Sequence, residues 1–252
     1  MYGWATTAAA MVSAALWITG CGQQEKAPPA EPQSPVDRAA APYRQALASG
    51  PETASAHLRL GQVLAGYSQA DSAQAHFERA LALEPGNVDA HFELAKIHYS
   101  QSRFEEAVKA YQDVIRLKPN HTWALNNLGF VLKRLGRFEA SEQAYRQAIA
   151  ADSTFAQAYN NLAQLYKITD RPALAITLFE RARAIDPTFP EAYVNLAMIH
   201  REQRQVALES QALRDYLARF GTKGDHSAYA QQRLQEIAAE TAAPSPAAKK
   251  PR

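Results

Sequence analysis

The chain has few of the residues that support chemistry or charge-driven binding. It has a single cysteine, Cys21, among 252 residues, so no cysteine cluster is available to hold a metal ion. Its 27 lysine and arginine residues nearly balance its 25 aspartate and glutamate residues, and three of the basic ones, Lys249, Lys250 and Arg252, lie at its very end. A nearly neutral chain lacks the basic face that grips a phosphate backbone, so we expect no nucleic-acid partner.

Motifs of catalysis are missing as well. The sequence contains no glycine-rich dinucleotide or phosphate loop, no H-E-x-x-H zinc motif and no G-x-S-x-G nucleophile elbow. Histidines recur in register, His57 with His91 and His98 with His200, but no cysteine or carboxylate cluster accompanies them. We therefore expect no enzyme activity, no metal, no cofactor and no small-molecule substrate.

The sequence does contain a 34-residue period. One phase of the period is marked by Pro51, Pro85, Pro119, Ser153, Pro187 and Gly221. A period of this length is typical of stacked helical hairpins, which form one extended surface rather than a closed pocket. Counted from Ala54, five copies fill residues 54–221 without an insertion: 54–87, 88–121, 122–155, 156–189 and 190–221.

Each copy predicts two helices. Positions 4, 7, 8 and 11 of the copy share one face of a first helix, and positions 20, 24 and 27 share one face of a second. Small residues at positions 8 and 20 let the two backbones approach, an aromatic ring at 24 fills the space between hairpins, and proline at 32 ends the second helix. One hairpin cannot bury its apolar stripe alone, so the copies are expected to stack.

These markers resemble the tetratricopeptide repeat family over about four fifths of the chain. In the first copy they are Leu60, Gly61, Leu64, Ala73, Phe77, Ala80 and Pro85. The resemblance implies an all-α fold, a right-handed superhelical solenoid of helix hairpins. The departures from the pattern are Val114, Ser141, Ser153, Glu209, Leu213 and Tyr216. The last three weaken the prediction of the second helix of the fifth copy.

A further helix is predicted at each end of the array. Residues 36–53 fit the second helix of a half repeat, and Pro42 is expected to delay its start because proline removes a backbone hydrogen bond. Residues 222–240 fit a capping helix with Asp225 at its N-cap. Its apolar side carries Ala230, Leu234, Ile237 and Ala238, and Arg233 is placed on the polar side.

The two termini read as segments outside the solenoid. Residues 1–20 carry no charge and are predicted to be a signal peptide, because the apolar run is shorter than a membrane span. Residues 21–35 have the composition of a flexible tether, and residues 241–252 that of a disordered tail. No lysine or arginine precedes the apolar run, as secretory signals usually require, so the true start codon is expected further upstream.

The apolar run ends in Ile18-Thr19-Gly20-Cys21, which resembles a bacterial lipobox. The resemblance implies that Cys21 is lipidated and becomes the first residue of the mature protein, which is then held to the membrane through this lipid. In a Gram-negative host, Gly22 after the cysteine implies the outer membrane, with the protein facing the periplasm. The alternative is an uncleaved anchor in which Cys21 is an ordinary thiol.

The side of each first helix that faces away from its partner helix is a candidate binding surface. It carries positions 2, 6, 9 and 13, and in the tetratricopeptide family this side lines the concave groove. Position 6 reads Arg59, Glu93, Asn127, Asn161 and Asn195. An asparagine amide both donates and accepts, so the row can hold the backbone of an extended peptide. It is similar to the asparagine ladder of O-linked N-acetylglucosamine transferase; a row of merely solvated amides is the alternative.

Cationic and aromatic residues run beside this row. Lys133, Lys167 and Arg201 occupy position 12, Arg134 position 13, and Trp123 and Phe130 positions 2 and 9 of the third copy. Together they predict a ligand segment that is extended, partly acidic and supplied with an apolar anchor. The alternatives are a solvated face for the cations and packing against neighbours for the two aromatic rings.

The predicted function is a non-enzymatic scaffold or adaptor, anchored to the bacterial envelope, that binds extended segments of other proteins. The form resembles the lipoprotein pilotins of type IV pilus assembly and the repeat lipoproteins that recruit peptidoglycan hydrolases, and the residues do not choose between these two. The alternative is a soluble or inner-membrane-anchored, chaperone-like module that receives unfolded client proteins.

Overall fold

The computed structural model describes residues 34–242, which form twelve helices and no strand. The helices are α1 (Pro35–Ser49), α2 (Ala54–Gly66), α3 (Ala70–Leu83), α4 (Val88–Ser100), α5 (Phe104–Leu117), α6 (Thr122–Arg134), α7 (Phe138–Ala151), α8 (Ala156–Ile168), α9 (Pro172–Ile185), α10 (Pro190–Glu202), α11 (Val206–Phe220) and α12 (Ser227–Ala242). The predicted all-α solenoid is confirmed. The predicted signal peptide, Cys21 and most of the predicted tether and tail lie outside the described residues.

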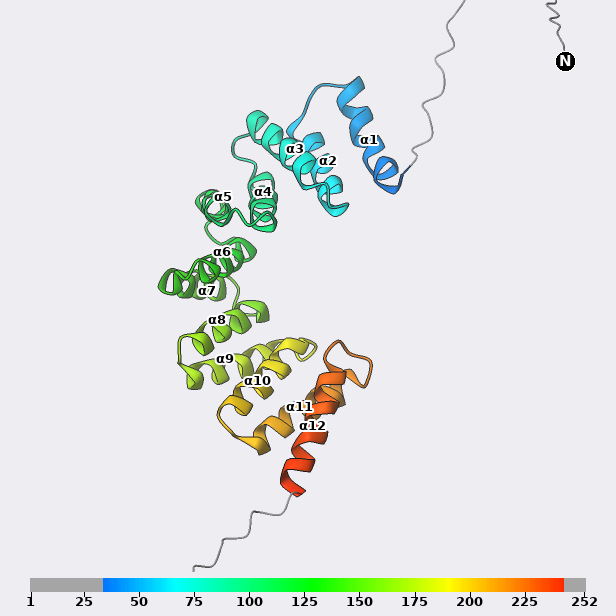
Figure 1. Cartoon of the computed structure of the whole chain (residues 1–252). Helices are drawn as coiled ribbons and strands as arrows, with labels where there is room; N and C mark the ends of the chain where they lie inside the picture. The colour runs from blue at the N-terminus through cyan, green and yellow to red at the C-terminus, as the bar shows by residue number, and fades with distance from the viewer. Residues whose placement is uncertain (1–33, 243–252) are drawn as a thin grey trace, which may run out of the picture.

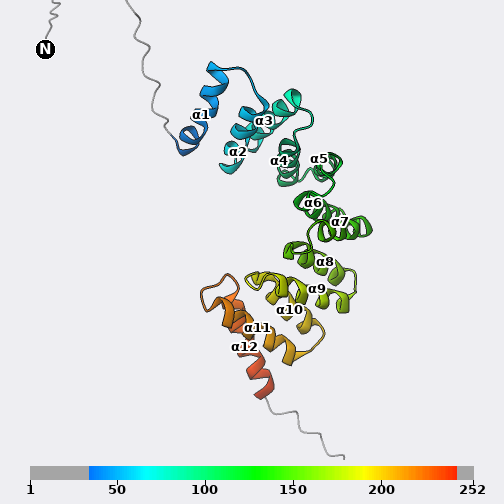
Figure 2. The ribbon, with the colours of Figure 1, turned by 180° about the vertical axis from the view of Figure 1, so that it is seen from behind.

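The helices pack in chain order into an open arc (Figure 1). Helices α2, α4 and α6 lie toward the inside of the arc, with α3, α5 and α7 toward the outside, and the view from behind agrees (Figure 2). Along the inside, α2 also contacts α4, α6 contacts α8, and α8 contacts α10. The first helices of the hairpins therefore form one continuous concave face.

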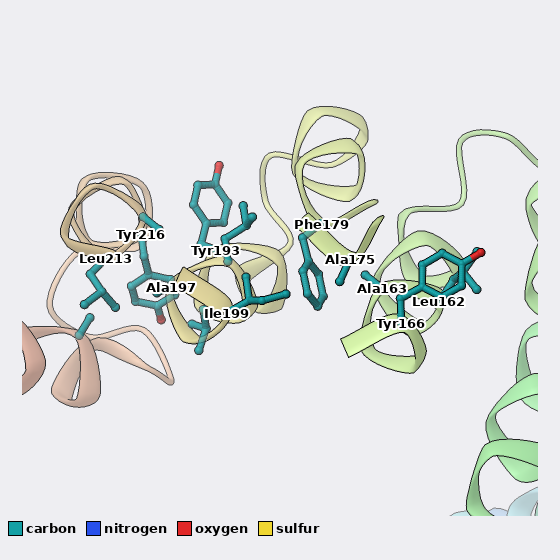
Figure 3. Packing of buried hydrophobic residues seen from close by; sticks show 14 of the residues in the cluster. Leu162, Ala163, Tyr166, Ala175, Phe179, Tyr193, Ala197, Ile199, Leu213 and Tyr216 are labelled. Carbon is teal, nitrogen blue, oxygen red and sulfur yellow. The ribbon is translucent and has the colours of Figure 1, made fainter. Parts of the chain in front are cut away.

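In the first four hairpins an aromatic ring of the second helix is buried against the first helix, at a position occupied by glycine or alanine. A Cβ atom on Gly129 of α6 would stand 2.8 Å from the ring of Tyr145 of α7, and one on Gly61 would stand 2.6 Å from the ring of Phe77. Figure 3 shows the Phe179 ring between Ala163 of its own hairpin and Ile199 of the next, within one buried cluster. The ring therefore joins neighbouring hairpins, as predicted, and also closes its own.

The first helices begin with side-chain caps in the amino-terminal half of the array. Thr53, Asn87 and His121 occupy the same position of successive copies, and each accepts a hydrogen bond from the backbone N–H three residues later. Phe155 and Phe189 stand at this position before α8 and α10 and provide no side-chain cap. Phe155 instead packs edge-on against Trp123, with ring centroids 4.7 Å apart.

Pro42 does not delay α1, so this prediction was wrong. The helix begins at Pro35, where the Ser34 hydroxyl caps it by accepting a bond from the Asp37 N–H at 3.2 Å, and it runs through Pro42 to Ser49. Pro42 is exposed. Proline on an exposed helix face removes a hydrogen bond that water can replace, at lower cost than in a core.

The N-cap predicted at Asp225 was also wrong, because α12 begins two residues later, at Ser227. A turn precedes the helix, closed by the Ser227 N–H, which donates to the Gly224 carbonyl at 2.9 Å. The Ser227 hydroxyl reaches further back and donates to the Gly221 carbonyl at 2.8 Å. The turn is thus fixed by a serine whose role the repeat pattern does not reveal.

Arg233 lies on the buried side of α12 rather than on its polar side, with 7% of its surface exposed. Its Nε atom donates to Glu209 Oε1 at 2.7 Å, and Glu209 of α11 is 1% exposed. Its Nη1 atom donates to Glu236 at 3.1 Å and to Glu240 at 2.9 Å. Glu209, which replaces the usual small residue, therefore has a buried partner, and α11 forms in full.

Three other departures from the repeat pattern, Ser141, Leu213 and Tyr216, are also accommodated in the interior. The Ser141 hydroxyl, fully buried, donates to the Gly129 carbonyl at 2.7 Å. In the fifth copy Leu213 stands at the aromatic position and Tyr216 at the alanine position, and both are fully buried. The Tyr216 hydroxyl accepts from the His226 N–H at 3.0 Å, which ties α11 to the turn before α12.

Replacing Arg233 with leucine should destabilise the protein by about 3 kcal/mol, because Glu209 is left buried without a counter-charge. Glu209→Ala should destabilise it less, since Arg233 keeps Glu236 and Glu240. The double variant Glu209→Ala/Arg233→Leu should be more stable than Arg233→Leu alone. Urea unfolding followed by circular dichroism measures all three, and equal losses in Arg233→Leu and in the double variant would contradict the pairing.

Candidate functional site

A pocket of about 500 Å³ opens on the concave face around α6. Side chains of α4 to α6 and of α8 line it: Lys96, Tyr99, Tyr111, Trp123, Asn126, Asn127, Phe130, Val131, Gln157 and Asn161. We call it the central pocket. The structure thus brings together four of the residues singled out from the sequence: Trp123, Asn127, Phe130 and Asn161.

The two predicted aromatic residues pack against neighbours and also face the pocket. Trp123 packs edge-on against Phe155 and is still 55% exposed. It is the most exposed of the aromatic side chains that line the central pocket. Phe130 is half-buried and meets Tyr99 edge to face, with ring centroids 5.6 Å apart. Both rings are therefore fixed in place while part of their surface remains open to a ligand, which lowers the entropy lost on binding.

The asparagine row is hydrogen-bonded along the stack. Asn161 Nδ2 donates to Asn126 Oδ1 at 2.9 Å, and Asn195 Nδ2 donates to Asn160 Oδ1 at 2.8 Å. Each bond joins a first helix to the next first helix. The Nδ2 atoms of Asn161 and Asn195 therefore hold neighbouring first helices together.

The partners Asn126 and Asn160 were missed by the sequence reasoning. They precede the row by one residue and are only 3% and 2% exposed. The signal was present as the repeated Asn-Asn pairs at 126–127 and 160–161. Within the described chain, no donor is hydrogen-bonded to the side-chain oxygens of Asn161 and Asn195; Asn161 is 4% exposed, and Asn195 is half-buried and more open to a ligand.

Asn127, the first member of the row, continues the chain of hydrogen bonds from Asn161 and Asn126 to the Tyr111 hydroxyl. Its Nδ2 atom donates to the Tyr111 hydroxyl at 3.3 Å, and its Oδ1 atom accepts from Asn126 at 3.2 Å. Burial raises the pKa of Tyr111 to about 12, so this hydroxyl stays protonated at neutral pH. The floor of the central pocket is thus neutral and hydrogen-bonded.

A second pocket, of about 580 Å³, lies beside the central one. Its lining is Phe104, Lys133, Arg134, Gln164, Lys167, Ile168 and Asn195, and we call it the basic pocket. Lys167 pairs with Glu202 at 2.8 Å, whereas no carboxylate of residues 34–242 lies within ion-pair distance of Lys133 or Arg134. Burial, and then the charge of Arg134, lower the pKa of Lys133.

Arg201, the remaining predicted site residue, lies in a third pocket of about 700 Å³. Its lining is Val194, Met198, Arg201, Glu202, His226 and Tyr229, and we call it the terminal pocket. The nine residues predicted for the groove therefore divide among three pockets on one face. Tyr229 was missed because α12 lies outside the 34-residue register.

Among residues 34–242, no group of three or more His, Cys, Asp or Glu side chains is arranged to hold a metal ion. The described helices include none with the length and apolar character that a bilayer crossing requires.

Comparison with known proteins identifies the repeats. One model of the tetratricopeptide repeat family matches residues 33–66 and 68–122, and a second matches residues 123–188. Together these matches span more than half of the chain. A comparison with curated protein sequences found no match.

Several solved structures share the fold. PilF of Pseudomonas aeruginosa is 21% identical, with a TM-score of 0.64 over 75% of this chain and 85% of PilF. PilW, described as a widely conserved type IV pilus biogenesis factor, is 23% identical, with a TM-score of 0.62 over 78% of this chain and 95% of PilW. YrrB, a repeat protein with an unusual peptide-binding site, is 15% identical, with a TM-score of 0.58 over 77% of this chain and all of YrrB.

The helix that carries the central pocket should loosen in acid because its cap is a histidine. His121 Nδ1 accepts from the Ala124 N–H at 3.2 Å, and a protonated imidazole cannot accept there. Burial, and then the charge of Lys118, lower the pKa of His121 below its ordinary value of 6.5. This stabilisation is therefore complete above pH 6.5 and is lost as the pH falls through the lower, folded-state pKa.

Urea midpoints measured between pH 7.5 and 5 should therefore fall, and they should fall less in His121→Asn. Asparagine keeps the cap, as Asn87 does for α4, and does not titrate. The dependence of the urea midpoint on pH should be weaker in His121→Asn but not absent, because burial also lowers the pKa of His76 and of His98. Superimposable pH profiles of wild type and His121→Asn would contradict the role of this cap.

Proposed function

The chain belongs to the tetratricopeptide repeat family, and on this premise we propose that it is a non-enzymatic scaffold that docks extended segments of other proteins. The observation that carries the proposal is the central pocket, in which an exposed, fixed tryptophan stands beside a second aromatic ring and a hydrogen-bonding amide. This combination is typical of the anchor points that dominate the energy of protein interfaces.

The shape of the concave face favours an extended ligand. The first helices lie side by side along the inside of the arc, so their outward side chains repeat once per hairpin. An extended backbone presents its own N–H and C=O groups at regular intervals. The side-chain oxygen of Asn195 on α10 can accept a backbone N–H of such a chain.

The chemistry of the face favours an apolar anchor followed by acidic residues. Trp123, Phe130 and Tyr99 supply apolar surface in the central pocket, and Lys133 with Arg134 supply positive charge in the basic pocket. A carboxylate of the ligand would give Lys133 a counter-charge that the described chain does not provide. Charge-assisted hydrogen bonds of this kind are about twice as strong as neutral ones.

We propose further that the scaffold is anchored to the bacterial envelope through a lipid on Cys21. The support is the lipobox-like Ile18-Thr19-Gly20-Cys21, which follows an uncharged apolar run. PilW, which shares the fold, is a type IV pilus biogenesis factor, so a role in assembling an envelope structure fits this arrangement. If two or three acyl chains are attached, membrane residence is stable, since each buried methylene adds about 0.8 kcal/mol.

The groove is tested by replacing its anchor residues. Crosslinked co-purification from the native envelope should lose a partner in Trp123→Ala/Phe130→Ala, with a loss of about 30-fold for a hot spot worth 2 kcal/mol. Substitutions at these two positions test binding more directly than substitutions of the asparagines, because Asn161 and Asn195 also join neighbouring helices.

Leu174→Ala is the matched control, because Leu174 is 49% exposed on α9, which is a second helix of its hairpin. Circular dichroism must show that every variant is folded. If the same partners are recovered at the same level with the double variant, recognition does not use the central pocket.

The anchor is tested by mass spectrometry of the mature amino-terminal peptide. A peptide that begins with an acylated Cys21 is expected, and Cys21→Ser should abolish both the acylation and the membrane association. A full-length chain with Met1 attached and Cys21 unmodified would refute the lipid anchor and favour the chaperone-like alternative.

A further inference from the structure

The terminal pocket gives the concave face a second apolar hollow. Val194 and Met198 come from α10, and Tyr229 comes from α12. Met198 is 39% exposed, although methionine is otherwise a residue of cores. An unbranched, polarisable side chain of this kind adapts its shape to an incoming apolar group.

Helix α12 therefore does more than close the apolar core. Its buried side, with Ala230, Arg233 and Ile237, covers the end of the stack. Tyr229 and His226 instead face the groove beside α10. A helix that served only as a cap would not need a tyrosine next to the exposed Met198.

The repeat register relates the two apolar pockets. Phe130 and Met198 occupy position 9 of the third and fifth copies, and the residue at this position in the copy between them is the polar Gln164. Gln164 lines the basic pocket together with Lys133 and Arg134. The concave face is therefore apolar, then basic, then apolar along the direction of the stack.

The distance between the two apolar pockets sets a length for the ligand. Helix α6 contacts α8 and α8 contacts α10, so two helix-to-helix steps separate them. With steps of about 8–10 Å, the separation is about 20 Å. An extended chain advances about 3.3 Å per residue, so about six residues span it.

We propose that the three pockets bind one continuous, extended segment of a partner protein, with two apolar side chains about six residues apart and acidic residues between them. This inference rests on the proposed docking function and specifies its ligand. The chain's own carboxyl-terminal segment carries the positive charges of Lys249, Lys250 and Arg252. The basic pocket is also positively charged, through Lys133 and Arg134, and would repel this segment, so we assign the bound segment to a partner protein.

The probes are synthetic, fluorescein-labelled peptides, and the readout is fluorescence anisotropy with the purified full chain. The first peptide has a phenylalanine and, six positions later, a leucine, so that both side chains point to the same side of an extended chain, and three of the five residues between them are aspartate. Three others lack the leucine, lack the phenylalanine, or carry asparagine for aspartate. The first peptide should bind about tenfold more tightly than each of the others, as expected for an added contact worth 1.4 kcal/mol.

Protein variants assign each anchor to its pocket. Met198→Ser should abolish the advantage given by the second apolar residue and leave the first unaffected, and Trp123→Ala should do the reverse. A peptide with the reversed sequence places leucine before phenylalanine. Comparing the two peptides shows whether each pocket selects a side chain or only fixes the direction of the peptide. Changing the peptide residue and the pocket residue separately and together isolates the coupling between them. The control variant Leu174→Ala should leave every affinity unchanged.

The outcomes separate the two proposals. If peptides with one anchor bind as tightly as the first peptide and depend on Trp123 alone, the two-anchor ligand is refuted and the docking function stands. If no peptide binds the wild-type chain, both are refuted. If Lys249→Gln/Lys250→Gln/Arg252→Gln binds the first peptide tenfold more tightly than wild type, the chain's own end occupies the groove and the assignment to a partner is overturned.

Discussion

The contact between a small residue on the first helix and an aromatic ring on the second governs the whole molecule. At Gly129 there is no room for a single carbon atom above Tyr145, and the same holds for Gly61 and Phe77. This contact fixes how closely the helices of a hairpin approach. Because it recurs at a constant interval in the first four copies, these hairpins follow one another in the same way, and the stack curves into an arc.

The arc has consequences for where polar groups can be buried. Every contact is between near neighbours, so a polar side chain in the interior must find its partner within one or two helices. The asparagine bonds between first helices and the Glu209–Arg233 pair both meet this condition. The asparagine bonds lie between the first helices that form the groove, so they stiffen the surface that we assign to ligand binding.

The periodic part of the structure could be predicted from the sequence, and the rest could not, for a physical reason. Leu60, Gly61 and Phe77 recur because each copy packs against identical neighbours, and the same register correctly grouped Trp123, Asn127 and Phe130 on one face. Arg233 and Tyr229 lie in α12, which has no counterpart in the repeat, so no register indicated which way they face.

The Glu209–Arg233 pair also fixes which repeat ends the array. Repeat proteins commonly grow when a repeat is duplicated, but a second copy of the fifth repeat would place a hairpin rather than α12 beside the original Glu209. That carboxylate would then be buried against a helix with no arginine in register, at a cost of several kcal/mol. Duplication is therefore open only to the earlier repeats, and the fifth is committed to remain the last.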